Sequence, residues 1–123
     1  MPKIKVNLSL KNKNEVINKE FKGIIIDNKI IYKDENVSVT FLCEKNKLIM
    51  NRNSPEYNAK FIFSNNNITK CVYNVKSEGI LIYFYIKTKK LIIDNKRFFV
   101  DYELYQQDEL IEAVNFEIKY EVI

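Results

Sequence analysis

Arg52 is the residue of this chain best placed to do chemistry. It shares one parity with Leu48 and Met50, and alternate side chains of a β-strand point to the same face. This spacing predicts that the guanidinium points inward or at the rim of the fold, where a charge must be paired or hydrogen-bonded. Two roles suit that position. Arg52 either closes one end of the fold by bonding to strand-end carbonyls, or it anchors the carboxylate or phosphate of a ligand.

Three further side chains are candidate partners of Arg52. Glu112 sits on an apolar parity between Leu110 and Val114, and its carboxylate would neutralise a guanidinium. Tyr32 and Tyr73 carry hydroxyls that need a hydrogen-bond partner when buried. We therefore take Arg52, Tyr32, Tyr73 and Glu112 as the candidate ligand-binding residues.

The residue types that most enzymes and metal sites use are scarce. The chain has no histidine, which removes the commonest general base and metal ligand. Its two cysteines, Cys43 and Cys71, stand alone and do not form a zinc motif. Both alternate with apolar residues, so we expect buried, reduced thiols in the cytoplasm. No spacing of carboxylates, lysines or tyrosines picks out a catalytic pair, so we expect a non-enzymatic protein without a cofactor or metal.

One predicted strand face combines aromatic and basic side chains. Tyr83 and Tyr85 alternate with the apolar residues of segment 79–90, and Lys87, Lys89, Lys90, Lys96 and Arg97 follow them. Aromatic platforms beside cations are typical of single-stranded nucleic-acid binding. Ordinary cross-strand pairing of tyrosines and a protein-interaction surface fit the same pattern. The net charge of +4 comes from 20 basic and 16 acidic residues that are mixed along the chain, so we do not expect nucleic acid to be the main partner.

The elements that must position these residues are β-strands. In segment 79–90, Ile80, Ile82, Phe84 and Ile86 fall on one parity, which predicts a central strand with its inner face in the core. Comparable alternation, bounded by short polar turns, recurs along the whole chain. The predicted strands are 3–11, 15–26, 29–33, 37–44, 47–53, 59–64, 68–76, 79–87 (continued or partnered by 90–94), 98–104 and 110–122.

Turns of two to five residues join these segments, and such short connections allow only antiparallel pairing. A closed barrel gives every strand the same core and leaves no open edge. The sequence therefore predicts a single domain, residues 1–123, that forms an antiparallel meander β-barrel of about 8–10 strands. Gly23 predicts a bend or a bulge in the second strand. The longest apolar run, 79–86, is too short for a membrane helix, so we expect no membrane span.

Seven phenylalanines take inward parities in this barrel. Side chains nearly fill an eight-stranded barrel, whereas one or two more strands leave room for a small ligand. Seven rings would occupy much of that room, so both a packed core and a pocket lining are compatible with them. These residues are Phe21, Phe41, Phe61, Phe63, Phe84, Phe98 and Phe116.

The chain resembles the YwiB-like family of small, calycin-like bacterial β-barrel proteins of unknown function. The resemblance covers essentially the whole chain and rests on the meander order and on landmarks at characteristic spacings. They are Gly23, Tyr32 with Glu35, Arg52 in Leu-Ile-Met-Asn-Arg-Asn-Ser, Tyr73 followed by Gly79, Thr88-Lys-Lys-Leu, and Tyr102-Glu-Leu. The chain departs from the family pattern at Asn53-Ser54-Pro55 and between Tyr73 and Gly79. The resemblance implies a lipocalin-like barrel and supplies no activity.

Three kinds of function agree with these patterns. The first is a carrier or sensor of a small apolar or anionic amphiphilic ligand, which is the interpretation we favour. The second is a protein-interaction module, and the third is a weak single-stranded nucleic-acid binder that uses Tyr83 and Tyr85. A continuous interior cavity that reaches Arg52 would favour the first, and an exposed apolar patch would favour the second. A contiguous basic stripe would favour the third.

Overall fold

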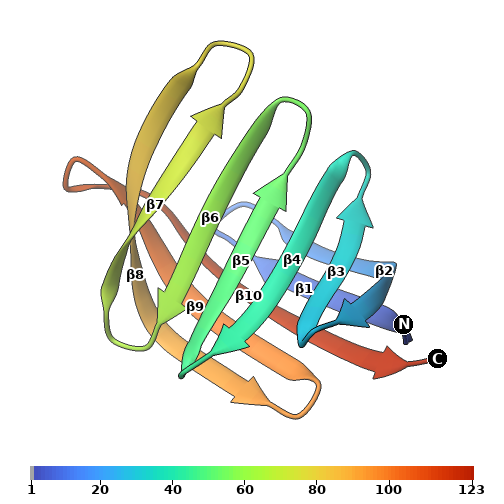
Figure 1. The fold of residues 1–123 in the computed structure, drawn as a ribbon. Helices are drawn as coiled ribbons and strands as arrows, with labels where there is room; N and C mark the ends of the chain where they lie inside the picture. The colour runs from blue at the N-terminus through green and yellow to red at the C-terminus, as the bar shows by residue number, and fades with distance from the viewer. Residues whose placement is uncertain (1) are drawn as a thin grey trace.

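A computed structural model describes residues 2–123, and these form a closed antiparallel barrel (Figure 1). The sheet order β1-β10-β9-β8-β7-β6-β5-β4-β3-β2 is that of a meander in which β1 closes the ring by pairing with both β2 and β10. This confirms the predicted fold class. The ten strands are β1 (Lys3–Lys11), β2 (Val16–Ile26), β3 (Lys29–Asp34), β4 (Val37–Glu44), β5 (Lys47–Asn53), β6 (Tyr57–Ser64), β7 (Ile68–Val75), β8 (Ile80–Asp94), β9 (Arg97–Gln106) and β10 (Glu109–Val122).

Tight turns set the order of the strands. Asp27-Asn28, Lys45-Asn46 and Gln107-Asp108 each place two consecutive residues at positive φ. Two such residues in a two-residue loop match the right-handed twist of the flanking strands, as in type I′ hairpins. Asn and Asp tolerate this conformation better than most residues, which is why polar pairs mark the hairpins.

β8 is one long strand with an irregularity in its middle. Its register with β9 shifts between Thr88 and Lys90, so residues 90–94 continue the strand beyond the shift. Thr88 is fully buried there, and its Oγ1 accepts a hydrogen bond from the backbone N–H of Ser64. The turn after β6 also bonds to the backbone of Thr88 through Asn66 and Asn67. This contact joins the β6–β7 turn to β8 at the end of the barrel that also holds the chain termini (Figure 1).

Gly23 sits at a corner of the barrel but not in a bulge. The sequence predicted a bend or a bulge at Gly23, and the bulge is excluded because the register of β2 with β1 runs through Gly23 without a shift. A Cβ at this position would lie 2.5 Å from the carbonyl oxygen of Ile31 in the neighbouring strand. The glycine therefore allows β2 and β3 to approach closely at the point where β2 begins to pair with both neighbours.

The core consists of the inward-facing side chains of the ten strands. All seven inward phenylalanines belong to it or pack against it, and Phe63 contacts both Tyr102 and Phe116 through tilted or edge-on rings. Cys71 is buried among them as predicted, whereas Cys43 is exposed. The prediction of burial for Cys43 is wrong because β3 pairs with β4 only as far as Leu42, so that Cys43, near the end of β4, has a paired strand on the β5 side alone.

The barrel opens at the end opposite the termini, because two pairs of neighbouring strands separate there. β2 pairs with β3 only over Gly23–Ile26, although β2 begins at Val16. β8 pairs with β9 only from Tyr85 onward, although β8 begins at Ile80. Figure 1 shows the β7–β8 hairpin rising at the top of the view while the β9–β10 hairpin projects to the side. The backbone pairing of the sheet is therefore interrupted twice at this end.

Candidate ligand-binding site

Arg52 lies on the inner face of β5 near the open end of the barrel. Its register partners are Val39 on β4 and Ala59 on β6, both of which are buried. The side chain is partly buried, and its Nε donates a long hydrogen bond of 3.4 Å to the hydroxyl of Tyr57. The inward parity predicted for Arg52 is confirmed. Its partner is a tyrosine hydroxyl and not one of the strand-end carbonyls that closing the fold would use.

Tyr57 is held in place by its own loop and by the neighbouring hairpin. Its ring stacks on Tyr73 with centroids 4.7 Å apart and planes 8° from parallel. Its backbone N–H donates to Ser54 Oγ at 3.2 Å, which orders the Pro55 loop. Lys76 Nζ donates to Asn53 Oδ1 at 2.7 Å and to the carbonyl oxygen of Ser54 at 2.8 Å, tying the β5–β6 and β7–β8 loops together. Hydrogen bonds within the β5–β6 loop, and between that loop and the β7–β8 loop, thus hold the segments that carry the Tyr57–Tyr73 stack.

The positive charge of Arg52 affects the pKa values of other tyrosines on the inner face. Burial raises the pKa of Tyr32 to about 12, and the Arg52 guanidinium opposes that rise. Burial raises the pKa of Tyr102 well above its usual value, and the Glu112 carboxylate adds to the rise while Arg52 opposes it. Burial and Tyr57 together raise the pKa of Tyr73, again against Arg52. These phenols are therefore protonated near neutral pH and can donate hydrogen bonds, and the charge of Arg52 lowers the pKa of each.

An apolar cavity of about 330 Å³ adjoins this group. All of its lining residues have inward parity, and they come from four consecutive strands, β6 to β9. Tyr73 belongs both to this lining and to the stack with Tyr57, so the cavity reaches the Arg52 cluster through the Tyr57–Tyr73 pair. The lining residues are Phe61, Cys71, Tyr73, Ile82, Phe84 and Leu104.

Arg52 has no counter-ion among residues 2–123, since none of their ion pairs includes it. Glu112, the predicted partner, is exposed and accepts a hydrogen bond of 3.1 Å from Asn12 Nδ2. The predicted pairing of Glu112 with Arg52 is therefore wrong. Glu112 keeps the inward parity of its register partner Leu104, but it is exposed near the loop that joins β1 to β2, where Asn12 donates to its carboxylate.

The structure brings together part of the predicted set and adds a residue that sequence reasoning missed. Arg52, Tyr32 and Tyr73 lie close enough for the arginine to influence both phenols, whereas Glu112 lies on the exposed rim. Tyr57 lies outside the predicted strand, which begins at 59. Its parity with Ala59, Phe61 and Phe63 was the available signal, but Pro55 directly before it favoured a loop.

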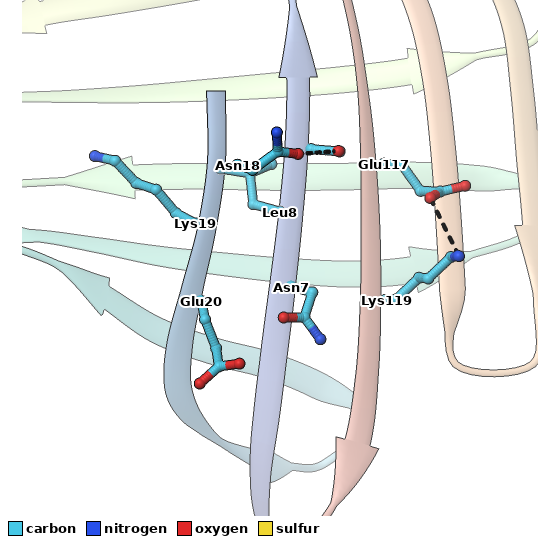
Figure 2. Close-up of a pocket in the computed structure, with 8 residues that line it drawn as sticks. Asn7, Leu8, Asn18, Lys19, Glu20, Glu117 and Lys119 are labelled. Atoms are coloured by element: carbon cyan, nitrogen blue, oxygen red, sulfur yellow. Dashed lines mark hydrogen bonds and ion pairs between the residues drawn. The ribbon is translucent and has the colours of Figure 1, made fainter. Parts of the chain in front are cut away.

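Two depressions with larger volumes lie on the outside of the barrel and are chemically different from this cavity. Figure 2 shows one of about 480 Å³ on the outer side of β2, β1 and β10. Each charged residue of its lining is in an ion pair, such as that of Lys119 Nζ with Glu117 Oε1 at 3.6 Å, and Ser9 Oγ donates to Asn18 Oδ1 at 2.6 Å. A surface of this kind has no free charge to offer a ligand.

The outer face of β7, β8 and β9 carries the tyrosines singled out in the sequence. Tyr83 and Tyr85 are exposed, as predicted, and Lys70 Nζ lies 4.3 Å from the centre of the Tyr83 ring. A groove of about 510 Å³ beside them is lined by Ile68, Tyr85, Lys87, Tyr105 and Asp108. Carboxylates interrupt the cations here, because Lys87 is the register partner of Glu103 and Lys90 that of Asp101.

Neither a metal centre nor a membrane helix is evident in the part of the chain that the structure describes. No three His, Cys, Asp or Glu side chains among residues 2–123 are grouped as metal ligands would be. The same residues include no helix with the length and apolar character that crossing a bilayer requires.

The fold and the site together define a small antiparallel β-barrel with ten strands, one open end and an apolar cavity beside an interior arginine. The chain belongs to the family described as a domain of unknown function, DUF1934, which it matches over residues 3–118. Its structure is similar to the crystal structure of the ywiB protein from Bacillus subtilis, with a TM-score of 0.65 and 16% identity over 98% of this chain and 90% of that one. No curated protein matches the chain. The resemblance to the YwiB-like family is thus confirmed, and at this identity the likeness establishes the fold alone.

Proposed function

We propose that this protein is a non-enzymatic binding protein for a small apolar or amphipathic molecule, held inside the barrel with an anionic group toward Arg52. The observation that carries the proposal is an inward-facing apolar cavity whose lining residue Tyr73 stacks on Tyr57, the hydrogen-bond partner of an arginine without a counter-ion among the described residues. Apolar walls with a few convergent polar groups are the usual composition of a small-molecule site.

The size of the cavity limits the class of ligand. Ligand pockets commonly enclose about 300–1,000 Å³. At about 330 Å³ the cavity is near the lower limit, which suits a short chain or a single ring system rather than a long lipid. A partly open mouth would let a polar head remain near solvent while the apolar part is buried.

The chemistry beside the cavity favours an acidic head group. A partly buried guanidinium that contacts only a neutral phenol is incompletely compensated, and a carboxylate or phosphate would supply the missing charge. Neutral tyrosine hydroxyls around it would add donors to the same anion. We favour this interior site over the outer tyrosine face because carboxylates are interspersed among the lysines of that face.

The test compares one anionic and one neutral probe of the same shape. Decanoate and decanol are titrated calorimetrically into wild-type protein, Arg52→Met and Arg52→Lys. We expect Arg52→Met to weaken decanoate binding at least about tenfold, or ~1.4 kcal/mol, and to leave decanol unchanged. Arg52→Lys keeps the charge and should lose less. Failure of the wild type to bind either probe would refute an interior site for molecules of this class.

A second variant separates the cavity from the charge. Cys71 is buried in the cavity lining, and Cys71→Leu places a larger side chain in the space. Both probes should then bind more weakly, provided that the melting curve shows an intact fold. Equal binding by this variant would place the ligand elsewhere. Native mass spectrometry of protein purified from its own host would identify the class of any molecule that it retains.

A further inference from the structure

Residues 80–84 of β8 have a paired strand on only one side. Their partners on β7 run from Val75, opposite Ile80, to Cys71, opposite Phe84. On the other side, pairing with β9 begins only at Tyr85. Figure 1 shows the reason, since the β7–β8 and β9–β10 hairpins diverge at this end of the barrel. The barrel therefore presents a short open strand edge at residues 80–84.

This edge is apolar on both faces. Ile80, Leu81 and Tyr83 are 46%, 51% and 45% exposed, while Ile82 and Phe84 line the interior cavity. The five residues include no charge and no proline, and the register shift in β8 lies outside them. Charged side chains, prolines and bulges are the features by which natural proteins protect an exposed edge from pairing, and residues 80–84 contain none of them.

Another open edge of the same barrel, on β2, is protected. Residues 16–22 of β2 lack a β3 partner, since that pairing begins at Gly23. There Lys19 Nζ forms an ion pair with Asp34 Oδ1 of β3 at 3.6 Å, across the gap, and further charged side chains lie along the segment. The contrast within one molecule indicates that the edge of β8 is left available for a strand.

We propose that this edge pairs with the same edge of a second copy of the chain, forming a two-fold symmetric dimer by antiparallel strand addition around Ile82. In that register Ile80 lies opposite Phe84 of the second copy, and Leu81 lies opposite Tyr83. Every opposed pair is apolar or aromatic, and such cross-strand pairs stabilise a sheet. A two-fold axis uses the same patch on both subunits, which is the commonest arrangement of homodimers.

The dimer would cover two exposed features at once. Unpaired backbone N–H and C=O groups along residues 80–84 would gain partners, and Ile80 of each copy would lie on the inner face near the other copy's cavity. The contact is short, so the association is concentration-dependent rather than permanent. This inference does not depend on a ligand, because it rests on strand pairing and on exposed apolar side chains.

The test measures association and then locates it. Sedimentation velocity is recorded over a wide range of concentrations for the wild type and for the double variant Leu81→Lys with Tyr83→Lys, which places lysines opposite each other across the two-fold axis. We expect a concentration-dependent dimer for the wild type and at least about tenfold weaker association for the variant. Both residues are half-exposed, so melting curves should show the monomer fold unchanged.

A matched control and a backbone readout complete the test. Ile68→Lys changes an exposed isoleucine of β7 that lies outside the edge, and it should leave association unchanged. Hydrogen–deuterium exchange should show amides within residues 80–84 becoming more protected as the wild-type concentration rises. A wild type that stays monomeric throughout, or a dimer unaffected by the lysines, overturns the proposal. Protection of these amides only on addition of a foreign extended peptide also overturns it, in favour of a heterologous strand.

Discussion

The Nε atom of Arg52 lies 3.4 Å from the hydroxyl oxygen of Tyr57, and this contact connects the interior charge of the barrel to its aromatic lining. Tyr57 in turn stacks on Tyr73, which lines the apolar cavity. Three residues from β5, β6 and β7 thus form a continuous path from a cation to an apolar space. That path is the structural basis of an amphipathic binding site.

Removing the Tyr57 hydroxyl should have a measurable effect on stability. Tyr57→Phe deletes the acceptor of a guanidinium donor, and because the bond is long and partly buried we expect a loss of about 1 kcal/mol in the free energy of unfolding. Tyr57→Ala removes the stack as well and should cost roughly 0.5–1.5 kcal/mol more. Urea denaturation measures both. Tyr73→Phe is the control, and a loss there equal to that of Tyr57→Phe would contradict the assigned hydrogen bond.

Gly23 should tolerate no side chain. The added Cβ of Gly23→Ala would meet the carbonyl oxygen of Ile31 at 2.5 Å, so the backbones of β2 and β3 must shift, at a cost of roughly 1–3 kcal/mol. Gly79→Asn is the comparison, since Gly79 has a φ of 62° with open space around it and Asn accepts that conformation. Thermal unfolding should show the larger fall for Gly23→Ala. The reverse order would show that the close approach at the β2–β3 corner is not a constraint.

The two thiols should react at very different rates. Cys43 is exposed and should be modified rapidly by a thiol reagent in the folded protein. Cys71 is buried, and burial raises the pKa of its thiol to about 11, so its thiolate is scarce and shielded near neutral pH. Labelling kinetics of Cys43→Ser and Cys71→Ser distinguish the two. Fast modification of Cys71 in native protein would show that the cavity admits the reagent freely.

The free energy of unfolding should fall in strong base because the buried phenol of Tyr32 ionises. The pKa of its phenol is raised by burial from 10.0 to about 12, so the folded state holds the proton more tightly than the unfolded state. The contribution is complete below pH 10 and is lost as pH rises from about 10 to about 12, which amounts to on the order of 2–3 kcal/mol. Chemical denaturation at a series of pH values should show a shallower decline for Tyr32→Phe. Identical pH slopes for this variant and the wild type would show that Tyr32 is not the group responsible.

The strands and the side of each strand that faces the core follow from local patterns. Alternation in segments such as 37–44 and 47–53 predicted β4 and β5 with the bounds that the structure has. Polar pairs such as Asp27-Asn28 marked the hairpins because few other residues adopt positive φ at low cost. Alternation is a property of the chain itself, so it needs no knowledge of neighbouring strands.

Burial at the ends of strands did not follow from the same patterns. Cys43 and Glu112 have inward parity, yet both are exposed. Ile80 has the same parity as the buried Ile86 and is also exposed. Parity assigns a face, whereas burial depends on how far the neighbouring strands extend along that face. Only the arrangement of all ten strands decides this.

The sequence by itself determined a single antiparallel meander barrel with Arg52 on its inner face, because period-two alternation and short polar turns are local and jointly demand one shared core. The tertiary structure alone decided where neighbouring strands of that barrel separate and which side chain Arg52 contacts. The separation of β2 from β3 and of β8 from β9 depends on how far each pair of neighbouring strands stays paired, which no single segment encodes. The pairing of Arg52 with Tyr57 instead of Glu112, the apolar cavity and the open edge at residues 80–84 all depend on that closure.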